Sequence, residues 1–265
     1  MSERIERDLR GKVAIVTGAG SRAEGIGNGR AASILLAAEG AKVLLVDANR
    51  AWAERTREMI VAEGGEAEVQ VGDVTKQDDC AGIVAAAKAR WGRVDILVNN
   101  VGIGGAKGTA ETVDLEEWNR GLLINVTSMM LMAKYAVPEM AAAGGGAIVN
   151  IASVAGLRGG NPNLLYPTSK GAVVQMTRAM ASHHAKQKIC VNCVCPGMVY
   201  TPMMYANGMD EAMREARRQR SLLKTEGSGW DTGAAVLWLA SGHARWVTGI
   251  VLPVDAGATA ATLTL

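Results

Sequence analysis

The sequence from Thr17 to Gly27 reads Thr17-Gly18-Ala19-Gly20-Ser21-Arg22-Ala23-Glu24-Gly25-Ile26-Gly27, between an apolar run and a helical pattern. Such a turn presents bare backbone N–H groups and the positive end of a helix dipole, which together favour an anion. A plain strand–helix turn also contains a glycine or two, so a lone glycine motif is a weak signal. Four glycines directly after the first apolar run favour a dinucleotide pyrophosphate, namely Gly18, Gly20, Gly25 and Gly27.

Outward from this turn, short runs rich in Val and Ile alternate with helical patterns. Buried strands are predicted over residues 12–17, 42–46, 67–71, 94–98, 147–151, 189–194 and 250–254. Helices are predicted over residues 26–38, 51–63, 76–90, 115–142, 164–185 and 232–240. The alternation predicts one α/β domain over residues 1–265, a doubly wound parallel sheet of seven strands with helices on both faces. Residues 200–229 contain no predicted strand, and we expect a helical lid there.

Composition places the chain among ordinary soluble globular proteins. It has 265 residues, 49% of them hydrophobic, and a net charge of +2, so no broad field favours nucleic acid or anionic lipid. Met1 to Arg10 lacks the apolar region of a signal peptide, and no run is long enough to span a membrane. We therefore expect a cytoplasmic protein.

The cysteines do not form a disulfide framework or a predicted metal site. Cys193 and Cys195 share one face of a predicted strand, and Cys190 points to the other. No second cluster completes a zinc site, and the histidines are scattered. We interpret the cysteines as small buried side chains and expect no metal.

The predicted second strand is followed by Asp47, about 20 residues beyond the glycine-rich turn. A carboxylate there accepts hydrogen bonds from the ribose hydroxyls of adenosine and repels a 2′-phosphate, which favours NAD over NADP. A solvated turn aspartate is the alternative. Arg22 and Arg50 are nearby cations that could instead partner a phosphate.

Ser153, Tyr166 and Lys170 are the candidates for the chemistry. Tyr166 and Lys170 are four residues apart and share one face of a predicted helix. An ammonium beside a phenol favours the phenolate and lowers the phenol pKa, which gives an acid or base for a carbonyl or alcohol oxygen. Ser153 ends a strand and could hold the same substrate oxygen. Pro167 suits the first turn of a helix, so Tyr166 should lie at a helix start.

The chain resembles the short-chain dehydrogenases/reductases over nearly its whole length. The resemblance rests on motifs in family order: the glycine-rich turn, Asp73-Val74, Asn99-Asn100-Val101-Gly102, Asn125, Ser153, Tyr166-Pro167-Thr168-Ser169-Lys170 and Pro196-Gly197. It implies a Rossmann fold and an enzyme that moves a hydride between a nicotinamide and a secondary alcohol or ketone.

The resemblance also implies roles for residues. Tyr166 would be the general acid or base, Lys170 would lower its pKa and bind the nicotinamide ribose, and Ser153 would orient the substrate oxygen. Asn125 would hold a water linked to Lys170. The adenosine and pyrophosphate side would be lined by Gly18, Ser21, Arg22, Gly25, Ile26, Gly27, Asp47, Asp73, Val74, Asn100 and Gly102. The nicotinamide side would be lined by Pro196, Gly197, Val199 and Thr201. Taken singly, Asp73 could be a strand-end turn, Thr201 a helix N-cap and Asn125 a residue that distorts a helix.

The chain departs from the family pattern at two places. Six residues separate Gly18 from Gly25 where the family has three, so the longer loop could wrap a pyrophosphate differently. Val101 replaces the usual Ala beside the cofactor.

Substrate specificity should lie in residues 157–165 and 198–229. The second stretch is rich in Met, which suits an apolar or alicyclic substrate or, equally, packing within the lid or against another subunit. Arg158 is the candidate for an anionic group, whereas the arginines between 214 and 220 are interpreted as a solvated face. The resemblance implies a homodimer or homotetramer through the helices at 115–142 and 164–185.

The leading hypothesis is therefore an NAD-dependent dehydrogenase that oxidises an apolar or alicyclic secondary alcohol. The alternatives are a 3-oxoacyl-type ketone reductase, a non-redox enzyme on the same scaffold, and a nucleotide-sensing protein without catalysis.

Overall fold

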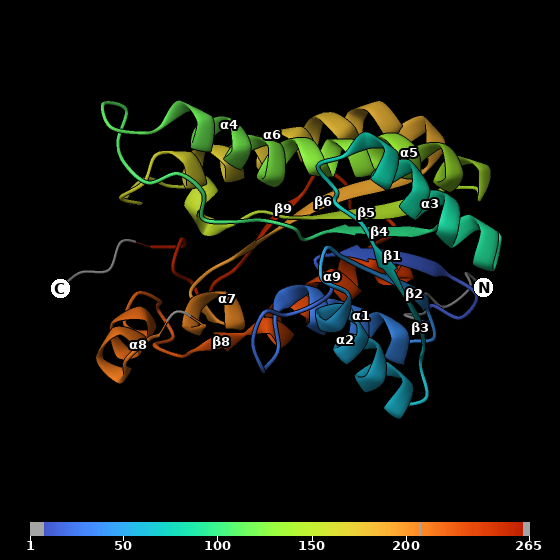
Figure 1. Ribbon diagram of the computed structural model, residues 1–265, viewed down its shortest axis with the longest axis horizontal. Coiled ribbons are helices and arrows are strands. Elements are labelled where there is room, and N and C mark those ends of the chain that lie inside the picture. The colour runs from blue at the N-terminus through green and yellow to red at the C-terminus, as the bar shows by residue number, and fades with distance from the viewer. Residues whose placement is uncertain (1–7, 207, 262–265) are drawn as a thin grey trace.

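The computed structural model describes residues 8–206 and 208–261 and contains one parallel sheet of seven strands (Figure 1). The strand order is β3-β2-β1-β4-β5-β6-β9, which makes the predicted sheet doubly wound. Its strands are β1 Val13–Thr17, β2 Lys42–Asp47, β3 Glu66–Val71, β4 Ile96–Asn99, β5 Gly146–Ile151, β6 Ile189–Pro196 and β9 Val251–Val254. Most of Met1 to Arg10, where we predict no signal peptide, lies outside the described residues.

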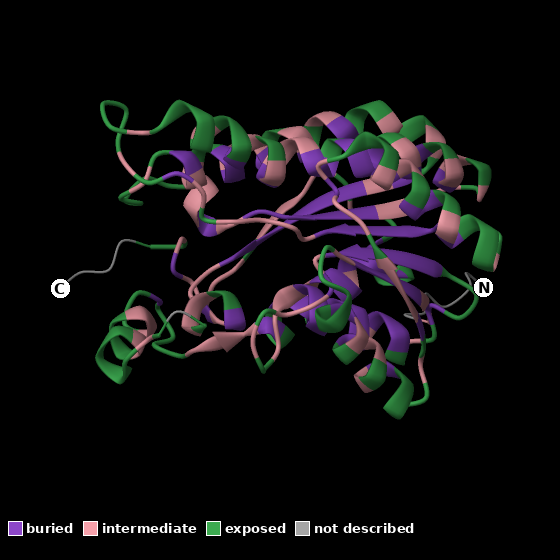
Figure 2. Ribbon diagram, viewed as in Figure 1, coloured by how far each residue is buried: buried purple, intermediate pink, exposed green. Residues whose placement is uncertain are grey.

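Helices cover both faces of the sheet, because strands with apolar side chains on both sides need two hydrophobic layers. One layer contains α1 Asn28–Ala38, α2 Arg50–Ala62 and α9 Gly229–Ala240. The other contains α3 Gln77–Trp91, α4 Leu115–Leu122, α5 Ser128–Ala142 and α6 Leu165–His184. Figure 2 shows that the buried residues are concentrated in the sheet and on the helix faces that meet it.

The helix predicted over residues 115–142 is interrupted. A π-helical turn, Leu123–Thr127, separates α4 from α5 and contains the buried Asn125. Turns of this kind are frequent at functional sites, and this one directs an amide into the protein interior.

The prediction that residues 200–229 contain no strand is wrong at its ends. β7 Val199–Tyr200 pairs in parallel with β8 Gly227–Ser228 and closes the base of the excursion. Between them lie two helices, α7 Pro202–Tyr205 and α8 Glu211–Arg218, so the excursion is otherwise helical; that it forms a lid over a substrate stays a prediction. Two-residue strands bury too few side chains to show period-two patterning, which explains the omission.

Helices α1 and α9 pack closely through small residues. A Cβ on Gly233 would lie 2.9 Å from the Cβ of Ala31 and 3.0 Å from its carbonyl carbon. Gly82 in α3 is the contrasting case, because a Cβ there would meet nothing within 4 Å.

We predict that Gly233→Ala lowers the free energy of unfolding by about 1–2 kcal/mol, because overpacking costs more than the gain in helix propensity. Gly82→Ala should raise it by about 0.5–1 kcal/mol, since only helix propensity changes. Urea denaturation of both variants at one protein concentration measures this. Equal effects of the two substitutions would contradict the close packing of α1 on α9.

Candidate active site

The predicted catalytic side chains gather beyond the carboxyl ends of β4 and β5. Ser153 lies two residues after β5, and Tyr166 and Lys170 lie in the first two turns of α6. Pro167 is the third residue of that helix, so its missing N–H interrupts no helical hydrogen bond. The fold therefore brings together the three groups that the sequence separates by up to 17 positions.

Ser153 and Tyr166 are in direct contact. The Ser153 hydroxyl oxygen accepts a hydrogen bond of 3.1 Å from the Ala155 N–H, which fixes the side chain at the start of a short 3-10 turn. A side-chain hydrogen bond from Ser153 to Tyr166 favours the phenolate, but burial has the larger effect, and the Tyr166 pKa is raised above its ordinary value. At neutral pH Tyr166 is therefore a phenol that can donate a proton.

Lys170 is buried and donates a 3.0 Å hydrogen bond to the carbonyl oxygen of Ile151. Burial lowers the pKa of Lys170 to about 8. Its Nζ lies 5.8 Å from the centre of the Tyr166 ring. In this arrangement burial raises the Tyr166 pKa and Lys170 is not among the groups that shift it, so a lowering of the Tyr166 pKa by Lys170 stays a prediction that requires Nζ to come closer to the phenol oxygen.

Asn125 uses both ends of its amide. Oδ1 accepts a 2.8 Å hydrogen bond from the Ile103 N–H, and Nδ2 donates to the Ile103 carbonyl oxygen and to Ser169 Oγ, at 2.9 and 3.0 Å. Asn125 thus holds the loop after β4 against α6. A Cβ on the preceding Gly102 would lie 3.1 Å from Lys170 Nζ, so this loop runs directly past the lysine.

Two thiols lie on the β6 face beside these groups. Cys193 and Cys195 are buried with their sulfur atoms 3.8 Å apart, and Cys190 projects elsewhere towards the carbonyl oxygen of Arg245. The predicted faces of the strand are confirmed. Among the residues that the structure describes, no group of three His, Cys, Asp or Glu side chains could hold a metal ion.

The glycine-rich loop fits a dinucleotide pyrophosphate. Gly27 is the N-cap of α1, with no side-chain hydrogen bond to the exposed N–H groups and no acidic residue in the first turn. A Cβ on Gly27 would meet only Ser21 Oγ, at 4.0 Å, so the approach to the helix start is uncrowded. An uncapped helix start with an open approach favours an anion. Arg22 is exposed at the same loop, as are the Gly25 backbone and, in part, Ile26.

The predicted adenosine side lies along the ends of β1, β2 and β3. Asp47 Oδ2 accepts a 3.0 Å hydrogen bond from the Gly20 N–H, so the carboxylate faces the glycine-rich loop. Asp73 accepts hydrogen bonds from the Thr75 N–H and hydroxyl, which makes it a turn-forming residue, and Val74 is buried. Asn100 Nδ2 donates to the carbonyl oxygens of Thr17 and Gly18, at 3.2 and 2.9 Å.

The predicted nicotinamide side follows β6, next to the strand that carries Ser153. β6 ends at Pro196, and the Gly197 N–H donates to the Val254 carbonyl oxygen at 2.9 Å. Val199 and Thr201 are buried, and Thr201 is the N-cap residue of α7 without a side-chain capping bond.

Two residues around the glycine-rich loop are absent from the sequence prediction. Arg30 is buried and donates to the Gly25 carbonyl oxygen and to Thr56 Oγ1, at 2.6 and 3.0 Å. Tyr205 of α7 donates from its hydroxyl to the Glu24 carbonyl oxygen at 2.7 Å. Arg30 could have been noticed, because it is the one charged residue in α1. Nothing in the sequence links Tyr205 to residue 24.

Residues 20–259 match the family described as "Enoyl-(Acyl carrier protein) reductase". A solved structure from Burkholderia xenovorans, described as a short-chain dehydrogenase/reductase, is 42% identical with a TM-score of 0.92, and the match covers 96% of this chain and 99% of that one. The chain belongs to the short-chain dehydrogenases/reductases. It is an oxidoreductase of this family.

Two further relatives carry named activities. The 2-(S)-hydroxypropyl-CoM dehydrogenase 3 of Xanthobacter autotrophicus is 36% identical over 95% of this chain and 98% of its own length. A 7 alpha-hydroxysteroid dehydrogenase, solved with NADH and 7-oxo glycochenodeoxycholic acid, is 32% identical with a TM-score of 0.88, over 97% of this chain and 98% of that one. Within the described part of this short-chain dehydrogenase/reductase, no helix is long and apolar enough to cross a membrane.

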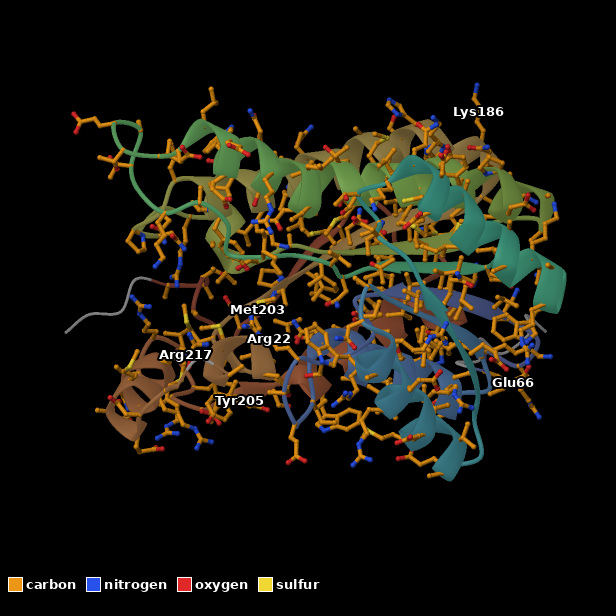
Figure 3. The ribbon with its side chains drawn as sticks, viewed as in Figure 1. Arg22, Glu66, Lys186, Met203, Tyr205 and Arg217 are labelled. Carbon is orange, nitrogen blue, oxygen red and sulfur yellow. The ribbon has the colours of Figure 1, made fainter. Side chains whose placement is uncertain are left out.

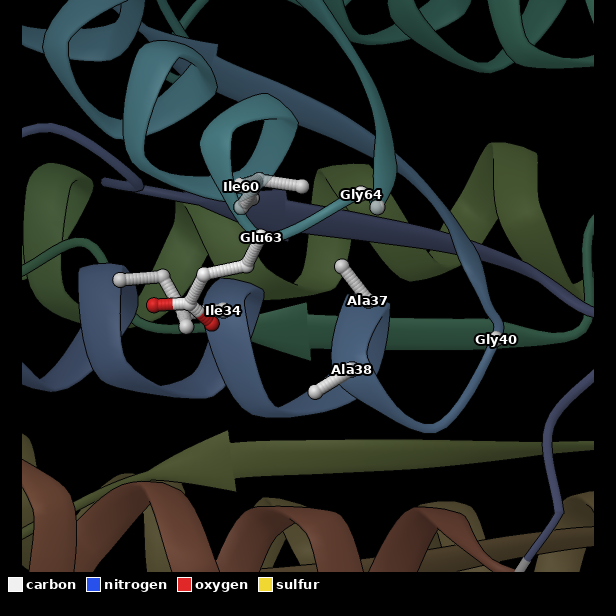
Figure 4. A pocket seen from close by; sticks show the side chains of 8 residues that line it. Ile34, Ala37, Ala38, Gly40, Ile60, Glu63 and Gly64 are labelled. Carbon is white, nitrogen blue, oxygen red and sulfur yellow. The ribbon is translucent and has the colours of Figure 1, made fainter.

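A crevice of about 190 Å³ between the ends of α1 and α2 is separate from this site (Figure 4). It is lined by small and apolar residues together with Glu63. Crossover helices run antiparallel to their strands, so the carboxyl ends of α1 and α2 lie at the amino edge of the sheet. The predicted catalytic side chains lie at the opposite edge.

We predict that Lys170 makes stability depend on pH. Its folded-state pKa of about 8 is below the ordinary 10.5, so between these values the unfolded chain binds the extra proton. The free energy of unfolding therefore rises with pH in this window. The free energy of unfolding of wild type minus that of Lys170→Met should rise by on the order of 2 kcal/mol from pH 8 to pH 10.

The control is Lys186→Met, because Lys186 points away from the molecule (Figure 3) and is exposed. Denaturant titrations at each pH give the three curves. If the difference in free energy of unfolding between wild type and Lys170→Met does not change from pH 8 to pH 10, the buried ammonium keeps its proton.

Proposed function

We propose that this protein is an NAD-dependent dehydrogenase that oxidises a secondary alcohol on an apolar or alicyclic substrate to the ketone. The observation that carries the proposal is that Ser153, Tyr166 and buried Lys170 gather just beyond β5 and at the start of α6, with Lys170 Nζ 5.8 Å from the centre of the Tyr166 ring. A nucleotide-sensing protein has no need of a buried ammonium beside a phenol, whereas proton transfer to an oxygen requires such groups.

In this proposal Tyr166 takes the hydroxyl proton of the alcohol and Ser153 holds the same oxygen by a hydrogen bond. Lys170 stabilises the phenolate when its Nζ moves from the Ile151 carbonyl oxygen towards the phenol oxygen. Asn125 keeps the loop after β4 and α6 in register around the pair. The bound nicotinamide supplies the hydride acceptor.

The proposed dinucleotide is held by the residues that the resemblance names, from Gly18 to Gly27 on the pyrophosphate and Asp47 on the ribose. NAD is favoured over NADP because the Asp47 carboxylate faces this loop and would repel a 2′-phosphate. Arg50, three residues after Asp47 in the sequence, is 3.5 Å from Glu54, which offsets its attraction for a phosphate. The NADH complex of the hydroxysteroid dehydrogenase supports the same choice.

The substrate class follows from the exposed apolar side chains on the two specificity segments. Leu157 and Leu164 are exposed on one segment, and Met203 and Met213 on the other. Arg158 donates to the Ala258 carbonyl oxygen, so its guanidinium already has a partner. The hydroxypropyl-CoM and hydroxysteroid relatives act on secondary alcohols of different size, which supports the reaction more than one substrate.

The proposal includes a cytoplasmic homodimer or homotetramer. Leu123 and Met130 expose apolar surface along the helices where the family resemblance implies a subunit contact. Leu115, also on this stretch, is 70% exposed.

The test is absorbance at the reduced-nicotinamide band. Purified protein is mixed with NAD or NADP and cyclic, aryl and hydroxy-acid alcohols at pH 7 and pH 9, and the corresponding ketones are tested with NADH. Because the Tyr166 pKa is raised, alcohol oxidation should be faster at pH 9 and ketone reduction faster at pH 7. Binding of NAD without turnover of any alcohol or ketone would favour the sensor.

Tyr166→Phe should keep the fold and NAD binding and lower turnover at least ~100-fold, a typical contribution of a general acid or base. Turnover and the NAD dissociation constant are measured on the same preparation. Turnover close to that of wild type would remove Tyr166 from the mechanism.

We predict that Asp47→Asn lowers the ratio of kcat/KM for NAD to that for NADP by about tenfold, because the charge that repels a 2′-phosphate is removed. The asparagine oxygen can still accept the hydrogen bond from the Gly20 N–H, so the loop keeps its support. An unchanged ratio would show that Asp47 does not face the adenosine ribose.

A further inference from the structure

The lid touches the extended glycine-rich loop at one polar contact. Tyr205, at the end of α7, donates its hydroxyl hydrogen to the Glu24 carbonyl oxygen at 2.7 Å. The next residue, Gly25, has φ of +109°, and a Cβ there would lie 2.0 Å from the Tyr205 hydroxyl oxygen. Figure 3 shows Tyr205, Met203 and Arg22 together where α7 meets the loop. The longer loop between Gly18 and Gly25 thus provides the surface that α7 of the lid contacts.

The loop side of this contact is fixed from beneath. The buried Arg30 guanidinium donates to the Gly25 carbonyl oxygen at 2.6 Å and to Thr56 Oγ1 at 3.0 Å. Thr56 in turn donates to the Ala19 carbonyl oxygen at 2.8 Å. Both ends of the loop are therefore tied to one buried cation, and a displacement at Gly25 is resisted by these hydrogen bonds.

The lid side is equally well connected. The Tyr205 ring packs on the Tyr200 ring with centroids 4.7 Å apart, and the Arg214 guanidinium lies 4.2 Å from the centre of the Tyr200 ring. Arg214 Nε donates to Glu226 at 2.6 Å, next to β8. This chain of contacts runs from α8 through β7 to α7, so the hydroxyl of Tyr205 transmits the position of the whole lid to the loop.

We propose that Tyr205 is a positioning residue that joins the pyrophosphate-binding loop to the substrate lid, so that dinucleotide and substrate strengthen each other's binding. This inference rests on the proposed function, because it needs a dinucleotide at the loop and a substrate under the lid. The coupling is reciprocal: the factor by which the substrate tightens NAD equals the factor by which NAD tightens the substrate.

The first experiment measures the NAD dissociation constant by quenching of tryptophan fluorescence. Tyr205→Phe removes the hydroxyl and keeps the ring on Tyr200, and should weaken NAD binding about fivefold, the value of one hydrogen bond. Tyr200→Phe is the matched control, because no hydrogen bond of its hydroxyl is found among the described residues. The NAD dissociation constant of Tyr200→Phe should stay within twofold of the wild-type value. If the constant of Tyr205→Phe also stays within twofold of wild type, the inference is overturned.

A double-mutant cycle guards against a general loss of stability. Gly25→Ala clashes with the Tyr205 hydroxyl only while Tyr205 is present, whereas the strain of a positive φ is common to both backgrounds. Gly25→Ala should therefore weaken NAD binding at least fivefold more in the wild-type background than in Tyr205→Ala. Additive effects would show that the two residues do not meet in solution.

The third measurement separates this inference from the proposed function. NAD binding is titrated with and without the ketone formed from the best alcohol of the activity test. NAD and a ketone are both oxidised, so they cannot react with each other. Wild type should bind NAD more tightly with the ketone, and Tyr205→Phe should lose most of that gain. If the ketone increases NAD affinity equally in both proteins, only the role of Tyr205 is overturned. If wild type binds no NAD, the proposed function is overturned and this inference with it.

Discussion

The site depends on how the carboxyl ends of β1 and β4 are held together at the centre of the sheet. Asn100 bridges them, because its side-chain amide donates to the Thr17 and Gly18 carbonyl oxygens and its backbone N–H donates to Thr17 Oγ1. At this point the strand order reverses direction, which is where doubly wound sheets bind their ligands. The glycine-rich loop leaves from one of these strands and the loop towards Asn125 from the other, so both halves of the site share this anchor.

Buried amides continue this anchor into the catalytic half. Asn99 Nδ2 donates to Asn150 Oδ1 at 2.9 Å, and Asn150 Nδ2 donates to Thr177 Oγ1 of α6 at 3.0 Å. A buried polar group without a partner costs about 1–3 kcal/mol, so such a chain allows little freedom in the relative placement of β4, β5 and α6. The position of α6 in turn sets where Tyr166 and Lys170 lie. The predicted catalytic side chains are thus positioned by buried amides of the sheet.

The sequence predicted what depends on neighbours along the chain and missed what depends on neighbours in space. The seven strands and the start of α6 at Leu165 follow from apolar runs and from Pro167, which are local signals. The sequence allowed Asn125 to distort a helix, but the π-helical form of the turn depends on Ile103 and Ser169, which hold its amide inward. The Asp47 position was predicted from spacing, but its bond to Gly20 needed the folded loop.

The electrostatics of Lys170 and Tyr166 share a single cause. Burial disfavours the charged form of both groups, so it lowers the pKa of the lysine and raises that of the tyrosine. A phenolate and an ammonium in contact relieve both penalties at once, because each supplies the counter-charge that solvent no longer provides. The spacing of four residues on one helix face places Nζ within a side-chain movement of the phenol. The proposed acid–base pair would therefore need only that Lys170 Nζ leave the Ile151 carbonyl oxygen, with no movement of the helix.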